Sequence, residues 1–166
     1  MRIQRLFRHW MSPRWVVKRA FTADILRDIR SAITAGEQRH DGEVRFAVEG
    51  SMPWSYLSRD AHPRERAVMA FSKLRVWDTA RNTGVLVYVN LADRDVEIVA
   101  DRGIAHRVGK ARWESICATM EVAFAEGRWR DGALAGVAQV SDAIAEVAPP
   151  VAGDQDNEVS DRPVLL

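Results

Sequence analysis

The stretch from Asn82 to Ile104, NTGVLVYVNLADRDVEIVADRGI, constrains the fold most strongly. The run from Val85 to Leu91 is almost entirely apolar, which is typical of a strand that is covered on both faces. After the charged turn ADRD, apolar and charged residues alternate with the period of two that marks a half-buried strand. The stretch therefore predicts an antiparallel β-hairpin.

The segments around the hairpin predict the rest of the sheet and its helices. Val44, Phe46 and Val48 alternate with other residues and indicate a first strand. Pro63 is well placed to open a helix, PRERAVMAFSKLRVW, that connects this strand to the hairpin. A connection of this kind places the first two strands parallel, with a right-handed crossover. The predicted fold class is α/β, with a small mixed sheet (a parallel pair plus an antiparallel hairpin) sandwiched by helices.

The chain of 166 residues fits one domain with an extension at each end. We expect residues 21–148 to form the α/β domain. Residues 149–166 contain prolines and scattered acids without periodicity, which predicts a disordered tail. Residues 1–20 form a basic amphipathic segment, because residues 1–19 hold six Lys and Arg and no acid. Its apolar helical face carries Ile3, Leu6, Phe7 and Trp10.

The N-terminal segment has two interpretations. A basic amphipathic helix is typical of a segment that lies on an anionic membrane surface. The same pattern also suits a helix that packs its tryptophan face on the domain. The formal net charge of the whole chain is only +1, so we expect no nucleic-acid partner.

Familiar catalytic signatures are missing from the sequence. It contains no glycine-rich phosphate loop and no HExxH, CxxC or GxSxG motif. Cys117 is the only cysteine, so a disulfide within the chain and a site of several thiolates are excluded. No apolar run approaches the length of a membrane span or of a secretory signal.

The acids around the hairpin are the main candidate for a site. Carboxylate and amide oxygens are the ligands that Ca²⁺ and Mg²⁺ prefer, so the cluster suits a hard cation. The alternative is a solvated edge strand whose charges prevent pairing with another sheet. The tryptophans of the domain are open to two readings as well, since they can line a pocket or pack in the core. The oxygen-bearing residues are Asp78, Asn82, Asp93, Asp95, Glu97 and Asp101.

The same stretch and the helices that follow it resemble the TPM domain family, over about Phe21 to Val147. The family pattern is an N-G-V-L-[LI] strand, a D-[RK] turn, an [IV]-E-[IV] strand and a glycine, then a helix, a segment F-x-x-G-[RKD]-[WY]-x-x-G and a final helix. The matching residues are Asn82, Gly84, Val85, Leu86, Asp93, Arg94, Val96, Glu97, Ile98, Gly103, Phe124, Gly127, Arg128, Trp129 and Gly132.

The resemblance implies an α/β sandwich and a site at the hairpin rim. With Asp78, the motif positions Asn82, Asp93 and Glu97 are the expected ligands of Ca²⁺ or Mg²⁺. Asp95 and Asp101 lie outside the motif and remain the better candidates for solvation. The other residues expected at the rim are Arg94, Asp95, Asp101, Arg102, Trp113 and Trp129.

Family members are often tied to membranes, in the assembly, repair or regulation of membrane complexes, and some are reported as cation binders or weak acid phosphatases. The chain resembles the compact bacterial branch without a signal peptide or a transmembrane anchor. We therefore expect a non-enzymatic binding, assembly or regulatory factor in the cytoplasm, peripheral at the inner membrane. It would act on a membrane-associated protein and contact anionic lipid through residues 1–19. The alternative is a weak divalent-cation-dependent acid phosphatase.

Overall fold

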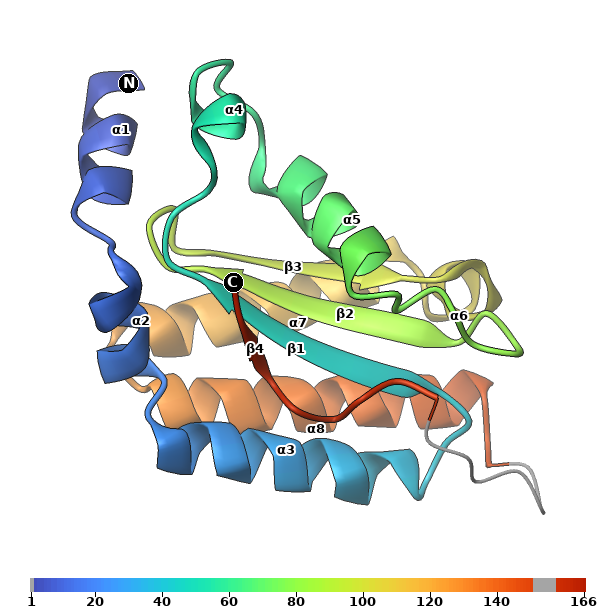
Figure 1. Cartoon of the computed structure of the whole chain (residues 1–166). Helices are drawn as coiled ribbons and strands as arrows, with labels where there is room; N and C mark the ends of the chain where they lie inside the picture. Colours follow the sequence, from blue (N-terminus) through green and yellow to red (C-terminus); the bar gives the residue numbers. More distant parts are fainter. Residues whose placement is uncertain (1, 151–157) are drawn as a thin grey trace.

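The computed structural model describes residues 2–150 and 158–166, and side chains from Ile3 onward. It contains one mixed sheet with helices on both faces (Figure 1). In chain order the elements are α1 (Arg2–Trp10), α2 (Arg14–Ala20), α3 (Ala23–Glu37), β1 (Glu43–Glu49), α4 (Trp54–Leu57), α5 (Pro63–Lys73), β2 (Gly84–Asn90), β3 (Asp95–Ala100), α6 (Arg102–Val108), α7 (Lys110–Ala125), α8 (Trp129–Val147) and β4 (Val164–Leu165).

The sheet has the strand order β3-β2-β1-β4. Strands β1 and β2 are parallel, with Phe46 opposite Val87, and helix α5 lies in the connection between them. Strands β2 and β3 form the antiparallel hairpin, with Tyr88 opposite Glu97. The predicted α/β class, with a parallel pair and a hairpin in one sheet, is confirmed.

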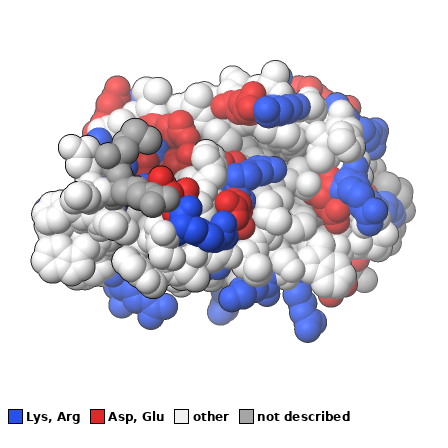
Figure 2. All heavy atoms as spheres, turned by 90° about the horizontal axis from the view of Figure 1, so that it is seen from above, with Lys and Arg blue, Asp and Glu red and all other residues white. Residues whose placement is uncertain are grey.

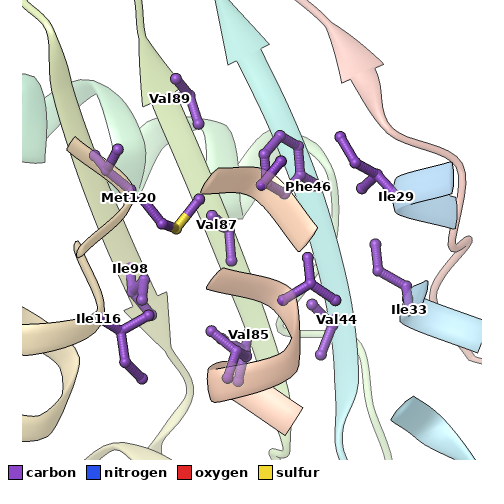
Figure 3. Packing of buried hydrophobic residues seen from close by; sticks show 14 of the residues in the cluster. Ile29, Ile33, Val44, Phe46, Val85, Val87, Val89, Ile98, Ile116 and Met120 are labelled. Atoms are coloured by element: carbon purple, nitrogen blue, oxygen red, sulfur yellow. The ribbon is translucent and has the colours of Figure 1, made fainter. Parts of the chain in front are cut away.

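Helices α3, α7 and α8 cover one face of the sheet, and α5 covers the other (Figure 1). The larger core lies on the three-helix side, where Val44 and Phe46 of β1 meet Ile29 and Ile33 of α3 (Figure 3). A smaller cluster on the α5 side contains Tyr88, which is fully buried. Strand β2 contributes to both clusters, which explains why its sequence is continuously apolar.

Gly84, at the start of β2, is required by a close approach of two backbone segments. A Cβ atom at this position would lie 1.8 Å from the carbonyl oxygen of Val76. The loop that leads into the hairpin therefore crosses directly over the first residue of β2. This contact gives Gly84, the glycine of the family's strand motif, a structural role.

The C-terminal part of the chain differs from the prediction. Residues 149–166 were expected to be a disordered tail, but β4 pairs in parallel with β1, and Ala47 lies opposite Val164. Pairing with an open strand edge and burial of apolar side chains stabilise this segment, and neither is visible in local composition. Residues 151–157 lie outside the described part of the chain.

The link between α3 and β1 contains a carboxyl group with an unusual protonation equilibrium. Glu37 Oε1 accepts a hydrogen bond of 2.8 Å from the backbone N–H of Val44. Burial, with a smaller contribution from the nearby acids Glu43 and Asp161, raises the pKa of Glu37 to about 8 against the effect of that hydrogen bond. The folded state therefore holds this proton more tightly than the unfolded chain does.

We predict that Glu37→Gln makes the folding free energy less dependent on pH. In the wild-type protein the contribution of Glu37 to stability should fall as pH rises from about 4.5 to about 8, because the unfolded chain releases the proton first. Glutamine keeps the acceptor oxygen without the charge, so the variant should be more stable than the wild type above pH 8 by roughly 2 kcal/mol. Chemical denaturation at a series of pH values measures the difference. The exposed Glu114→Gln is the control, and a gain equal to that of the control would contradict the prediction.

Candidate functional site

Polar residues gather where the two parallel strands end. Glu49 is the last residue of β1 and Asn90 the last residue of β2, and both are buried. The carboxyl ends of parallel strands are where open α/β sheets usually place their ligand sites. Buried polar side chains need partners, so the contacts of Glu49 and Asn90 define the structure of this carboxyl end of the sheet.

Glu49 is held by a buried charge network on the α5 side of the sheet. Arg66 of α5 donates from Nε to Oε2 at 2.8 Å and from Nη2 to Oε1 at 2.6 Å, and the Tyr88 hydroxyl also donates to Oε2. Burial raises the pKa of Tyr88 and the adjacent Glu49 carboxylate raises it further. The Arg66 guanidinium also lies over the ring of Tyr56. This network joins α5 to β1 and leaves the Glu49 carboxylate fully engaged.

Asn90 positions the hairpin turn. Its side-chain Oδ1 accepts a 3.0 Å hydrogen bond from the backbone N–H of Asp93, which is a local turn stabilised by an asparagine side chain. Arg94 follows with a φ of 55°, in the left-handed region. The turn is also fastened to the end of β1, because the N–H of Leu91 donates to the Glu49 carbonyl. The turn that carries Asp93 is thereby fixed at the carboxyl end of β1 and β2.

Arg5 of α1 engages the Asp93 carboxylate in a bidentate ion pair. Arg5 Nε donates to Oδ1 at 2.9 Å and Nη2 donates to Oδ2 at 2.8 Å. The same guanidinium donates to the Ala61 carbonyl and to Asp60, each at 2.8 Å. Planar fork-to-fork pairing of this kind is strong and strictly oriented. Arg5 therefore fastens α1 to both the hairpin turn and the segment that precedes α5.

His9, one helical turn after Arg5, is 3% exposed and lies against the same carboxylate. Its Nε2 is 3.1 Å from Asp93 Oδ1, and its Nδ1 accepts a 3.2 Å hydrogen bond from the backbone N–H of Met52. Burial alone would raise the pKa of Asp93, but His9 and Arg5 outweigh it, so this pKa lies below its ordinary range. Asp93 is therefore a carboxylate held by the chain's own basic groups.

Two further acids, Asp95 and Glu97, lie along β3 on the α5 side. Arg64 Nη1 donates to Glu97 Oε2 at 3.1 Å, and His62 Nδ1 is 3.5 Å from Oε1. Asp95 differs from Glu97, because its Oδ1 is buried and has no hydrogen-bond partner among the described residues. Burial, together with the nearby acids Glu97 and Glu121, raises the pKa of Asp95 to about 6. Asp95 had been expected to serve solvation, yet one of its oxygens is removed from solvent.

The remaining predicted residues lie at the opposite end of the hairpin. Asp78 and Asn82 are exposed and precede β2, whereas Asp93 follows it. Asp101 caps α6 by accepting from the N–H of Arg102, whose side chain is exposed. Strand β2 has seven residues, so its two ends lie roughly 20 Å apart at the usual rise of a strand.

The predicted cation ligands Asp78, Asn82, Asp93 and Glu97 therefore do not converge on one point. Within the described residues, no three His, Cys, Asp or Glu side chains form a group that could hold a metal ion. The two predicted ligands on the Asp93 side, Asp93 and Glu97, are already paired with Arg5 and Arg64. A Ca²⁺ or Mg²⁺ ion shared by all four residues does not fit this arrangement.

The two tryptophans expected at the rim lie in or beside the core. Trp113 is 8% exposed, and Trp129 stacks on Phe124 with ring centroids 5.2 Å apart. Trp129 also lines a cavity of about 280 Å³ between α2, the hairpin turn and the α7–α8 turn, with Val16 and Arg94 among its other walls. Their role is therefore chiefly packing, one of the two alternatives left open by the sequence.

The sequence analysis missed most of the residues that build the site at the carboxyl end of the sheet. A signal existed in β1 and β2, since each apolar run ends on a single polar residue, Glu49 or Asn90. No local pattern indicated that Arg66 would reach Glu49, or that α1 would turn its basic groups toward Asp93. These contacts join positions 17 and 88 residues apart in the chain.

The fold and the contacts at the carboxyl end of the sheet define a small α/β domain with an N-terminal helix docked on its hairpin turn. The chain matches the TPM domain over residues 18–143 and belongs to that family. It is also similar to the NMR structure of the BA42 protein from the psychrophilic bacterium Bizionia argentinensis sp. nov., with a TM-score of 0.74 and 26% identity over 87% of this chain and 94% of the other. No curated protein gives a significant match. Helix α1 lies before the matched region, so the domain receives Arg5 and His9 from an extension.

We predict that Asp93→Asn loosens α1 without unfolding the domain. The substitution keeps the shape of the side chain and removes the charge that Arg5 and His9 face, which should weaken α1 docking by about 1–3 kcal/mol. A helix of nine residues is marginal without tertiary contacts, so its amides should exchange faster with solvent. Hydrogen exchange followed by NMR should show this acceleration in α1 and unchanged protection in α7 and α8. Asp24→Asn, which breaks the exposed pair with Arg27, is the control; equal α1 exchange in both variants would refute the role of Asp93.

Proposed function

We propose that the protein is a non-enzymatic binding factor that docks on a membrane-associated partner, with α1 and α2 lying against an anionic membrane surface. The observation that carries this proposal is the orientation of α1. Arg5 and His9 face inward, as described above, and most of the apolar stripe of the helix faces outward, with Leu6 half-buried. Ile3 is 83% exposed, Phe7 59% and Trp10 76%. This is the reverse of an ordinary surface helix, which buries its apolar stripe in the protein.

The outward stripe is part of a larger apolar surface. Trp15 of α2 and Trp54 of α4 are 62% and 70% exposed. An open groove of about 650 Å³ runs between α1 and the segment around α4, with Phe7, Trp10 and Trp54 among its walls. In Figure 2 the lower left, on the side where α1 lies in Figure 1, is a broad white area with Lys and Arg side chains along its lower border. An exposed apolar patch of this kind supports an interaction surface.

The charges beside this surface favour an anionic partner. Arg8, Arg14, Lys18 and Arg19 are exposed on α1 and α2. Basic groups near a membrane surface each contribute about 1 kcal/mol of attraction to anionic lipid. Tryptophan suits the interface between headgroups and acyl chains, because its ring is apolar and its N–H is polar. We therefore propose that the protein lies peripherally on the membrane, at the cytoplasmic face expected from the sequence. None of the helices described in the structure is long and apolar enough to cross a bilayer.

A phosphatase function has less support at this site. A divalent cation at Asp93 would have to displace Arg5 and His9 from the carboxylate. Glu49 is likewise engaged by Arg66 and Tyr88. The binding function leaves these ion pairs intact, which favours it over the phosphatase function.

Vesicle co-sedimentation tests the proposal. Vesicles of phosphatidylcholine with phosphatidylglycerol should retain the intact chain at low salt, and vesicles of phosphatidylcholine alone should retain much less, because the basic groups need anionic lipid. Phe7→Glu with Trp10→Glu should lower binding roughly tenfold or more, because two apolar side chains no longer enter the interface.

Val122→Glu on α7 is the matched control, since Val122 is 59% exposed outside α1 and α2. It should bind like the wild type. Retention of the α1 double variant at the wild-type level would contradict membrane docking through this stripe. A pull-down with the same three proteins then distinguishes a protein partner that uses the same residues.

A further inference from the structure

The C-terminal segment from Glu158 to Leu166 packs against the domain, and its last residues form the short strand β4 (Val164–Leu165) beside β1. Val164 and Leu165 pair in parallel with Ala47 and Val48, and the N–H of Leu166 donates to the Val48 carbonyl at 2.9 Å. Without this segment β1 would present an unpaired edge. An open strand edge is the structure that proteins use to capture extended peptides by backbone pairing.

Side chains of the segment enter separate places on the two faces of the sheet. Leu165 packs against the larger core cluster on the three-helix side, and Leu166 packs against the cluster on the α5 side. Val159, nearer the start of the segment, is 5% exposed. When a peptide pairs with a strand edge, its side chains alternate between the two faces of the sheet, and the separate contacts on each face determine which sequences bind.

Polar anchors hold the first half of the segment. The Glu158 carboxylate accepts from the N–H of Ala80 at 3.1 Å, and the N–H of Val159 donates to Glu43 Oε2 at 3.1 Å. The Arg45 guanidinium donates to the Ser160 carbonyl, and the Thr34 hydroxyl donates to Asp161. The two acidic side chains of the segment are thus met by donors of the domain. An extended peptide with acids at these positions fits the same donors.

The groove and its occupant come from different parts of the chain. Thr34, Arg45 and Ala80 lie within residues 18–143, which match the TPM domain, and the segment lies beyond them. The β-ladder between β1 and β4 spans only two residues. Glu158 and Asp161 also bring negative charge close to Glu43, whose pKa is raised by burial and then by these two acids. Short pairing and like charges limit the stability of the occupied state.

We propose that the edge of β1 is a peptide-binding groove for an extended acidic segment of a partner protein ending in apolar residues, and that the chain's own C-terminal segment fills it in cis. The partner segment carries acids in the places of Glu158 and Asp161 and apolar side chains in the places of Val159, Leu165 and Leu166. The inference concerns a different surface from α1 and does not depend on membrane docking.

Fluorescence anisotropy with a labelled peptide of residues 158–166 tests the proposal. The full-length chain with Leu165→Asp and Leu166→Asp, which releases the cis segment, should bind this peptide. The wild-type chain should bind it roughly tenfold more weakly, because the tethered segment competes at an effective concentration in the millimolar range. A peptide with Asp161→Lys is the matched control and should lose binding, because the Thr34 hydroxyl no longer meets a carboxylate.

Three results would overturn the proposal: no binding of the peptide to the released variant at millimolar concentration, equal binding of the control peptide, or equal affinity of the wild-type and released chains. A second measurement uses the wild-type chain alone and does not rely on a variant. Excess peptide should accelerate hydrogen exchange at the Leu166 amide of the chain, which donates to the Val48 carbonyl when the C-terminal segment is docked on β1. Unchanged protection of that amide under saturating peptide would equally refute exchange of the segment.

Discussion

The bidentate ion pair between Arg5 and Asp93 determines which face of α1 meets the domain. An arginine fork accepts only a narrow range of orientations toward a carboxylate, and His9 one turn later contacts Oδ1 of the same carboxylate. Once these two side chains face inward, the helical period forces Ile3, Phe7 and Trp10 outward. The exposed apolar stripe is therefore a consequence of a polar contact in the hairpin turn. In an amphipathic helix without such a contact, the same stripe would be expected to pack against the core.

Extensions at both ends of the chain use the domain as a platform. Helix α1 occupies the hairpin turn at the carboxyl end of β2, and the C-terminal segment occupies the edge of β1. Both lie outside residues 18–143, which match the TPM domain. The domain itself contributes buried, paired polar groups such as Glu49 and Arg66, which stabilise the carboxyl end of the sheet where α1 docks. A domain that positions two extensions supports the binding function proposed above.

The sequence predicted what depends on local pattern and missed what depends on distant contacts. The apolar run in β2 and the alternation in β3 identified the hairpin, and the helix between β1 and β2 fixed their parallel pairing. The four predicted cation ligands were grouped by their closeness in sequence and by motif position, but a hairpin places its entrance and its turn at opposite ends, so Asp78 and Asn82 lie far from Asp93. β4 was missed because a strand of two residues gains its stability from the β1 edge and not from its own sequence.

The orientation of α1 is the central claim, and solvent paramagnetic relaxation enhancement on the wild-type protein tests it most directly. A soluble gadolinium chelate should strongly broaden the indole N–H signal of Trp10, because its side chain faces solvent. The Nε–H signal of Arg5, hydrogen-bonded to Asp93, should remain sharp in the same sample. A protected Trp10 indole together with a broadened Arg5 signal would mean that α1 packs on its apolar face, and would contradict the account.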